Sequence, residues 1–399
     1  MFLNVLVVDR SPPASIVQGN ALIGVEVFQR LGHHRLTLVA PVTVEEHDAS
    51  IRQLEGLFDA VHLVPRRTRI PALGGLFEAR AQVSFPALPG LEIDAARRFA
   101  GTLRHLTLRE RFDVIHVRQL PMAPYGEGLR GGRLLELIDS ETLGAERARP
   151  RTMRTRVRAA LAAGLERRAM RNYQVVTAVA AADADRLRRL APDRRIDVVP
   201  NGVDADRFRP QPGVMPDSDT LVFVGAMSYP PNIAAVRHFC TDVLPLVRRS
   251  RPQLRVDIVG RDPARAVREL TAIDGVSVIG EVAEVLPYLA RAAVFVAPMI
   301  SGSGIKNKVL EAMAAGRPVV ATALAVEGIP VTSGTEVIIA DGVTNMAAAI
   351  ERLLASPPER EALGRAARAF VESRYTWDAC ASAYDRLYAE LAGPDRSSA

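Results

Sequence analysis

The stretch VFVAPMISGSGIKNKVLEAMAAGRPVVAT, residues 294–322, decides the fold class of this chain. Its continuous apolar run at 294–299 predicts a strand covered on both faces, 306–316 predicts a helix, and 318–322 predicts a second strand. A strand, a helix and a strand in this order form a βαβ unit, whose two strands lie parallel in one sheet. The stretch therefore predicts an α/β protein.

The same alternation runs along the rest of the chain, with one interruption. The other predicted strands are 4–9, 35–41, 60–65, 113–119, 134–139, 174–180, 220–225, 255–260 and 276–280. Pro, Gly, Asn and Asp crowd the segment 200–219, which we interpret as a linker. We therefore expect an N-terminal domain at 1–199 and a C-terminal domain at 220–375. A last helix at 376–392 is expected to pack back on the first domain, before a disordered tail at 393–399.

Composition favours an ordinary globular protein that meets an anionic partner. The 399 residues are 48% hydrophobic and 24% charged, with a net charge of +6. No basic stretch is interleaved with aromatic residues, so a nucleic-acid surface is poorly supported. The N-terminus does not resemble a signal peptide and no apolar run is long enough to span a membrane, which predicts a cytoplasmic protein. Cys240 and Cys380 are expected to be buried, reduced thiols.

Both lysines of the chain, Lys306 and Lys308, follow a loop that contains Gly302 and Gly304. We expect free backbone N–H groups where this loop enters the helix near 305, and the glycines let a ligand approach closely. Asn307 stands where a P-loop or a Rossmann fingerprint requires glycine. A helix terminus contributes about 0.3–1 kcal/mol toward an anion, whereas an ammonium about 4 Å from a phosphate contributes about 4 kcal/mol at a dielectric of about 20. The loop therefore predicts an anion site dominated by lysine; the alternative is a tight turn with solvated lysines.

Glu311 lies three residues after Lys308, on the same face of the predicted helix. Its neighbours are apolar, and a buried carboxylate is costly unless it is paired. Hydroxyl groups of a bound ribose would satisfy it, and so would an ion pair with Lys308.

Four segments resemble, in order and spacing, family 4 of the retaining GT-B glycosyltransferases. They are VVPNGVD, FVGAMSYPPN, VIGEV and SGSGIKNKVLEAMAAGRPVVAT. The loop GSGIKNK is most similar to that of bacterial exopolysaccharide-type sugar transferases. The resemblance covers essentially the whole chain and is most specific between Asn201 and Thr322. It implies two Rossmann-like domains with doubly wound parallel sheets that face each other across a cleft, the second holding a nucleotide-sugar donor.

The resemblance also implies roles for residues of the second domain. Glu311 is expected to bind the ribose, Lys308 and the amides of 303–306 the pyrophosphate, and 280–282 the base. The complete expected donor site is Asn201, Gly225, Gly280, Glu281, Val282, Gly302, Ser303, Gly304, Ile305, Lys306, Lys308 and Glu311. Ser303 stands where many relatives carry a glutamate near the donor sugar. Its hydroxyl can bind a sugar hydroxyl but cannot stabilise positive charge on a sugar ring.

In the first domain the resemblance points to two further places. Gly19 and Asn20, before the first predicted helix, match the loop that meets the donor phosphates and the acceptor. Asp139 and Ser140 lie where many relatives place a histidine of the catalytic cleft, so Lys308 and Asp139 are the expected catalytic residues. Asp139 is equally suited to cap the following helix.

No metal and no cofactor are expected. GT-A enzymes hold a divalent metal with an Asp-x-Asp pair, and this chain contains three such spacings: Asp183 with Asp185, Asp204 with Asp206, and Asp217 with Asp219. Their positions favour helix caps and turns, with the last pair in the linker. No His/Cys cluster has the spacing of a metal site.

An arginine-rich helix is predicted at 151–171. Its apolar stripe consists of Met153, Val157, Ala160, Leu161, Gly164 and Leu165. Such a helix can contact an anionic membrane at the inner face of the plasma membrane. It can also dock on its own domain with solvated arginines, which is the interpretation we favour.

Together these features predict a retaining glycosyltransferase. It would transfer a sugar from a nucleoside diphosphate donor, UDP or GDP, to a glycan or lipid-linked acceptor in bacterial surface polysaccharide synthesis. Two alternatives stay open. One is an isomerase similar to nucleotide-sugar 2-epimerases, which share the GT-B fold. The other is an inactive nucleotide-binding protein, which Ser303 suggests.

Overall fold

The computed structural model describes residues 1–13, 19–43, 54–66, 93–147, 152–302 and 304–393. The chain divides into two compact units. The first comprises Met1–Glu146, Met153–Val199 and Asp378–Ala399, and the second Arg147–Thr152 and Pro200–Trp377. Each unit contains one parallel sheet, which confirms the α/β class and the two sheets expected from the sequence.

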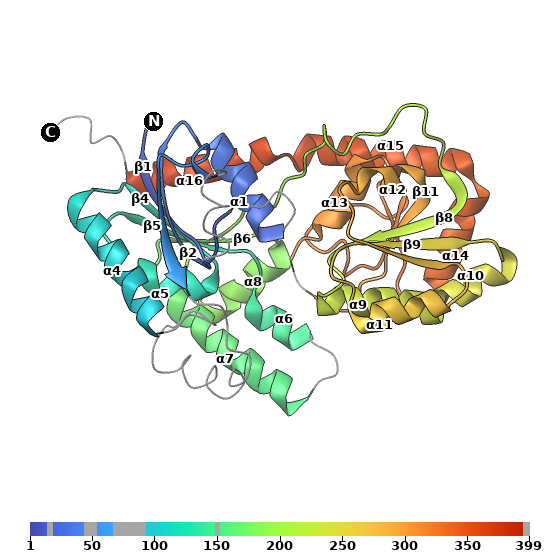
Figure 1. Cartoon of the computed structure of the whole chain (residues 1–399), viewed down its shortest axis with the longest axis horizontal. Helices are drawn as coiled ribbons and strands as arrows, with labels where there is room; N and C mark the ends of the chain where they lie inside the picture. The colour runs from blue at the N-terminus through green and yellow to red at the C-terminus, as the bar shows by residue number, and fades with distance from the viewer. Residues whose placement is uncertain (14–18, 44–53, 67–92, 148–151, 303, 394–399) are drawn as a thin grey trace. The chain divides into compact units, whose positions relative to one another are not determined.

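The first unit is built on a seven-stranded sheet with the order β3-β2-β1-β4-β5-β6-β7 (Figure 1). The strands are β1 (Asn4–Val8), β2 (Arg35–Thr43), β3 (Ala60–Arg66), β4 (Val114–Arg118), β5 (Gly132–Leu137), β6 (Val175–Ala178) and β7 (Ile196–Val198). All neighbours pair in parallel, so their carboxyl ends share one edge. The order grows outward from β1 in both directions, and such switch points are where doubly wound sheets bind ligands.

Helices cover both faces of this sheet. They are α1 (Gly19–Arg30), α4 (Ile93–Arg109), α5 (Ala123–Gly126), α6 (Glu141–Arg147), α7 (Met153–Met170), α8 (Ala181–Leu190) and α16 (Trp377–Ala392). The alternation of β4 distinguishes the two faces. His116 meets Phe28 of α1 and Tyr384 of α16, with ring centroids 5.8 and 5.2 Å apart. Ile115 and Val117 instead join a buried cluster with the apolar side of α4.

A buried network of charged side chains fastens α16 to this sheet. Arg118 donates hydrogen bonds to Asp9 at 2.5 Å and to Glu136 at 2.8 Å. His116 lies 3.0 Å from Glu136 through Nε2 and 2.6 Å from the Tyr388 hydroxyl through Nδ1. Burial alone would raise the pKa of Glu136, but Arg118 and His116 hold it at about 2. Because Tyr388 belongs to α16, the last helix completes the polar core of the first unit.

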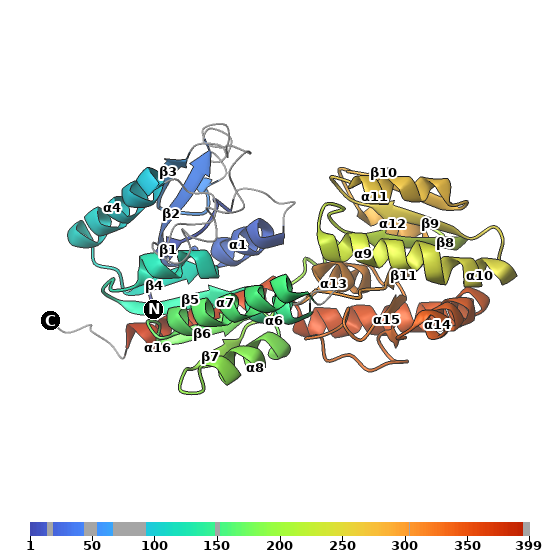
Figure 2. The same ribbon diagram turned by 90° about the horizontal axis from the view of Figure 1, so that it is seen from below.

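The second unit is built on a six-stranded parallel sheet with the order β10-β9-β8-β11-β12-β13. The strands are β8 (Asp217–Val224), β9 (Arg255–Val259), β10 (Val276–Gly280), β11 (Ala292–Ala297), β12 (Val319–Ala321) and β13 (Ile338–Ile339). The helices on its two faces are α9 (Pro230–His238), α10 (Leu244–Ser250), α11 (Arg265–Arg268), α12 (Leu286–Arg291), α13 (Asn307–Ala314), α14 (Val343–Ala355) and α15 (Pro357–Arg374) (Figure 2). All six residues of β11 are buried, as its continuous apolar run predicts.

The predicted linker 200–219 needs one correction. Strand β8 already begins at Asp217, so 217–219 belong to the sheet. Arg255 of the neighbouring strand β9 donates a hydrogen bond to the Asp217 carboxylate. An opposite-charge pair across two strands stabilises their pairing. The Pro and Asp residues of this segment indicate a turn, and the sequence pattern does not reveal the pairing with Arg255.

Helix α7 docks on the first unit through a different face from the one expected. The apolar side chains Met153 and Leu161 are 72% and 51% exposed, and Val157 and Leu165 lie on the same exposed side. The buried positions of the helix are Ala162, Glu166, Ala169 and Met170. Glu166 is stabilised there by hydrogen bonds from Thr142 and Ser140. The helix thus docks on its own unit with exposed arginines, as the favoured interpretation has it, but it does so through these positions and leaves its apolar stripe uncovered.

The two thiols are as expected. Cys240 and Cys380 are both free and buried. Burial raises the pKa of each thiol to about 12, so both stay protonated and unreactive.

Within the described residues, every helix is too short or too polar to cross a bilayer.

Candidate functional site

The lysine loop connects β11 to α13 at the carboxyl edge of the second sheet. Gly302 and Gly304 have φ angles of 112° and 69°, a region that side chains other than glycine rarely adopt. Helix α13 begins at Asn307, one residue after the start of the predicted range 306–316 and two after the start expected near 305. Ser303, the departure from the family pattern, lies outside the described residues. The first N–H groups of α13 are free of intrahelical partners, as at every helix start.

Lys308 is held by two residues that the sequence analysis did not identify. Its Nζ donates a hydrogen bond to the Asn232 side-chain oxygen. It also lies 4.6 Å from the ring centroid of Phe223, a cation–π distance. The amide of Asn232 in turn donates to the Ala226 carbonyl at 2.9 Å, which fixes its orientation. The position of the Lys308 ammonium is thus set before any ligand binds.

Electrostatics prepare Lys308 for an anion. Burial and the nearby Lys306 ammonium lower the pKa of Lys308 to about 7, and Glu311 opposes this shift. An anion beside the Nζ atom would favour the charged form and raise the pKa again. The Lys308 ammonium therefore has too little negative charge around it to offset its burial and the charge of Lys306.

Lys306 has a different local role from Lys308. It is 8% exposed, and its Nζ donates a hydrogen bond to the Gly304 carbonyl at 2.5 Å. This bond closes the loop on itself and brings a second ammonium near Lys308. Lys306 therefore stabilises the loop conformation and adds positive potential.

Glu311 remains near Lys308 without forming an ion pair with it in the described part of the chain. Burial raises the pKa of this carboxyl, and Lys308 and Arg207 partly offset the shift. Arg207, in the turn after Asn201, is a second neighbour that the sequence analysis missed. A half-buried carboxylate with a raised pKa gains from hydroxyl donors, which is the chemistry a ribose offers.

Asn201 and Gly225 are brought to this site by the fold. The buried Asn201 donates a side-chain hydrogen bond to Asn307, the first residue of α13, at 3.1 Å. Gly225 follows β8, and a Cβ atom added there would lie 2.7 Å from Asn232 Nδ2 and 3.0 Å from Lys308 Nζ. Glycine is therefore required at this position for the ammonium to lie where it does.

Gly280 ends β10, and Glu281 and Val282 follow it at the same edge of the sheet. Three strand spacings separate β10 from β11, about 14 Å. Val282 lines a shallow pocket of about 540 Å³ together with Gln211, Val214, Glu284, Tyr288 and others. Only an extended ligand would reach from this edge to Lys308.

Among the first-unit candidates, Gly19 and Asn20 form the first turn of α1 rather than a loop before it.

Asp139 follows β5 and is exposed. The cap of α6 is Ser140, whose Oγ accepts a hydrogen bond from the Leu143 amide at 3.2 Å. The capping role considered for Asp139 therefore belongs to Ser140.

The Asp-x-Asp pairs form hydrogen bonds within the protein. Asp183 accepts a hydrogen bond from the Ser140 amide at 2.8 Å, and Asp204 accepts from the amides of Asp206 and Arg207 at 3.1 and 2.8 Å. Asp204 therefore has the expected turn role, whereas Asp183 lies within α8, whose N-cap is Ala180, and contacts the backbone of Ser140 instead. The third pair lies on strand β8 instead of in a linker.

Comparison with known proteins agrees with this architecture. The family described as "Glycosyltransferase Family 4" matches residues 34–207, and that described as "Glycosyl transferases group 1" matches residues 218–356. Glycogen synthase from Mycobacterium tuberculosis is 32% identical over 209 residues, 48% of this chain and 48% of its own length. The match thus spans about half the length of that curated relative.

Solved structures show the same fold over nearly the whole chain. Sucrose-phosphate synthase from Thermosynechococcus elongatus has a TM-score of 0.74 at 18% identity, covering 97% of this chain and 99% of that one. HepE from Anabaena, in complex with UDP, has a TM-score of 0.69 at 15% identity, covering 98% and 100%. At these identities the likeness identifies the fold, which is GT-B. With its two halves matched in order by the two family descriptions, the chain belongs to the group 1, family 4 glycosyltransferases.

Proposed function

We propose that this protein transfers a sugar from a nucleoside diphosphate sugar to a glycan or lipid-linked acceptor, with retention of anomeric configuration, in bacterial surface polysaccharide synthesis. The observation that carries the proposal is Lys308. It is an ammonium with a lowered pKa, positioned by Asn232 and Phe223 at the mouth of a glycine loop. Such a group is suited to a diphosphate whose charge grows as it leaves.

The proposed reaction exchanges one bond for another at the anomeric carbon. The bond to the diphosphate oxygen breaks, and the acceptor hydroxyl forms a new bond from the same face of the sugar. The hydroxyl proton passes to the departing diphosphate. Lys308 and the free N–H groups at the start of α13 stabilise the leaving group, and Lys306 adds positive potential. In this mechanism catalysis is electrostatic preorganisation around the leaving group.

The same proposal assigns the remaining residues. Glu311 accepts hydrogen bonds from the ribose hydroxyls, Gly280 to Val282 contact the base, and Asp139 serves the reacting sugar from the first unit. Anabaena HepE, a structural relative, has been solved with UDP and with UDP-glucose. That precedent supports a uridine diphosphate sugar as the first donor to examine.

A donor panel with an acceptor-containing membrane extract tests the activity. We expect diphosphate release from one donor only when the extract is present, and loss of release in Lys308→Met. Release of a free epimer without any acceptor would instead identify an isomerase. Binding of a donor that is never consumed would identify an inactive protein.

We further propose that α7 contacts an anionic bilayer, which would bring the protein to a lipid-linked acceptor at the inner face of the plasma membrane. We call Met153, Val157, Leu161 and Leu165 the α7 stripe. Exposed arginines border it, namely Arg154, Arg156, Arg158 and Arg168. Each arginine near an anionic surface contributes about 1 kcal/mol, and the exposed apolar side chains add burial. Apolar side chains flanked by arginines fit an anionic bilayer better than they fit water.

Co-sedimentation with vesicles tests this contact. We expect binding to vesicles of phosphatidylcholine with phosphatidylglycerol and not to phosphatidylcholine alone. The double variant Val157→Glu, Leu161→Glu should abolish it. Leu108→Glu is the matched control, because Leu108 is 80% exposed on α4, outside the stripe. Equal binding by the double variant would refute the α7 contact.

A further inference from the structure

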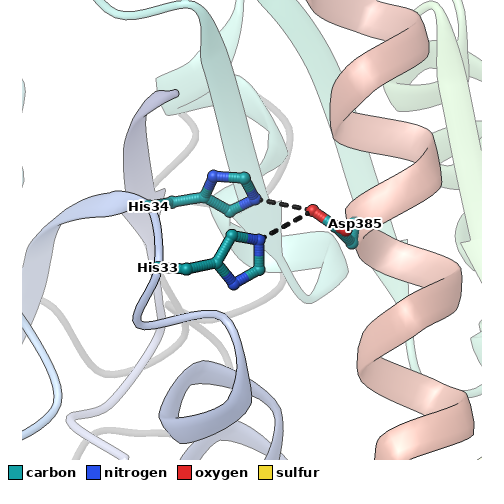
Figure 3. A group of neighbouring side chains, drawn as sticks. All are labelled: His33, His34 and Asp385. Atoms are coloured by element: carbon teal, nitrogen blue, oxygen red, sulfur yellow. Dashed lines mark hydrogen bonds and ion pairs between the residues drawn. The ribbon is translucent and has the colours of Figure 1, made fainter. Parts of the chain in front are cut away.

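Three potential metal ligands converge in the first unit, none of which has a part in the proposed transfer. His33 and His34 follow α1, and Asp385 lies on α16. Figure 3 shows both imidazole rings pointing toward the one carboxylate. The Asp385 Oδ1 atom is 3.1 Å from His33 Nε2 and 2.8 Å from His34 Nε2. All three ligand atoms lie within 4.8 Å of one another.

This spacing is close to that of a metal site. Bonds of about 2.0–2.2 Å in a tetrahedral site separate the ligand atoms by about 3.3–3.6 Å. Small side-chain rotations would therefore bring the two nitrogens and the oxygen around one ion. We propose that His33, His34 and Asp385 bind a divalent cation of the zinc class. Two imidazoles and one carboxylate suit Zn²⁺ better than Mg²⁺ or Ca²⁺, which prefer oxygen ligands.

The exposure of the three side chains fits a bound ion that has one coordination position open to solvent. The His34 side chain is 1% exposed and is therefore held in place, whereas His33 and Asp385 are 50% and 45% exposed. Water can then complete the coordination from the solvent side.

Two arginines close to the histidines in the sequence are paired with other carboxylates. Arg30 is paired with Glu26 at 2.6 Å and with Asp378 at 2.7 Å, and Arg35 lies 3.8 Å from Glu110. Among the described residues, the ion pairs of Asp385 are those with His33 and His34.

A bound ion would join two segments that are far apart in the sequence. Asp385 is separated from His33 by 352 positions and from His34 by 351. The ion would act as a clip that holds α16 against the end of α1. It would bind the folded first unit and thereby raise its stability by mass action.

Zinc titration of the full chain in metal-free buffer tests the proposal, with calorimetry for affinity and Co²⁺ absorption for tetrahedral geometry. We expect one ion per chain, and His33→Ala and Asp385→Asn should each weaken binding at least about tenfold. His238→Ala is the matched control, because His238 pairs with Asp242 at 2.7 Å and the described residues supply that pair with no third ligand. It should bind zinc as the wild type does.

Thermal unfolding supplies the second readout. At a zinc concentration about 100 times Kd, we expect the Tm of the wild type and of His238→Ala to rise by about 5 °C. The Tm of His33→Ala and Asp385→Asn should not respond. Absence of zinc binding by the wild type at millimolar zinc, or unchanged affinity in both cluster variants, would overturn the proposal. Donor turnover is unaffected in either case, so the proposed transferase function is tested separately.

Discussion

The protonation of Lys308 Nζ predicts how the affinity for a nucleoside diphosphate changes with pH. In the free protein its pKa of about 7 leaves the ammonium half protonated at neutral pH. A bound nucleoside diphosphate favours the charged form, so binding above this pH requires the uptake of a proton. We therefore expect diphosphate affinity to be constant below about pH 7 and to fall above it.

The size of the effect follows from the same pKa. Each pH unit above the free pKa costs about 1.4 kcal/mol, a tenfold rise in Kd, until the pKa of the complex is reached. Removing the charge with Lys308→Met is expected to cost more binding free energy than a rise of one pH unit. An ammonium about 4 Å from a phosphate is worth about 4 kcal/mol at a dielectric of about 20. Because the side chain is only half-buried, solvent screening lowers this value, and we expect about a hundredfold loss.

Calorimetric titration with UDP and GDP between about pH 6.5 and 8.5 measures both effects. The corresponding nucleosides are the control, since they lack the phosphates and their affinity should not follow this titration. In Lys308→Met the affinity should be low and independent of pH. A wild-type Kd that does not change across this range, or a pH dependence retained in Lys308→Met, would refute the placement of the diphosphate beside Lys308.

Four further substitutions examine the rest of the structure. Glu311→Ala should weaken UDP about tenfold or more by removing a charged acceptor, yet leave a 2′,3′-dideoxy analogue unaffected; equal losses for both ligands would exclude the ribose contact. Gly225→Ala places a Cβ 3.0 Å from Lys308 Nζ and should raise the UDP Kd while the Tm falls only slightly; calorimetry and thermal unfolding separate the two. Tyr388→Phe leaves the buried His116 without its hydroxyl partner and should lower the unfolding free energy by about 1–3 kcal/mol, whereas Glu136→Gln, which breaks a buried ion network, should cost about 3–5 kcal/mol. Urea unfolding that ranks these two variants in the opposite order would contradict the assigned network.

The anion loop could be located from sequence because its signals are local. A buried strand, glycines with positive φ and a helix start lie within a short segment, and these features do not need distant residues to be recognised. The same reasoning placed the helix start one to two residues early, at 305–306, whereas Lys306 is the N-cap and its side chain bonds back to the Gly304 carbonyl. The sequence also left two roles open for Asp139, a helix cap and a place in the cleft. The hydrogen bond from the Leu143 amide to Ser140 shows that Ser140 is the cap.

Local patterns failed where contacts join distant parts of the chain. Asn232 holds Lys308 from 76 positions away, and Asp385 meets His34 across 351. Neither pair has a characteristic spacing. The α7 stripe illustrates the same point, because periodicity reveals an apolar side of a helix without revealing whether the protein covers it.

The sequence by itself therefore determined the α/β class, the order of the strands and helices along the chain, and the loop that carries the lysines. Each of these depends on burial periodicity and turn chemistry, which act over a few residues. Only the tertiary structure decided which side chains surround Lys308, how α16 completes the first unit, and where two histidines meet an aspartate. Those positions result from the packing of whole sheets and helices, and no short segment of the chain contains that information.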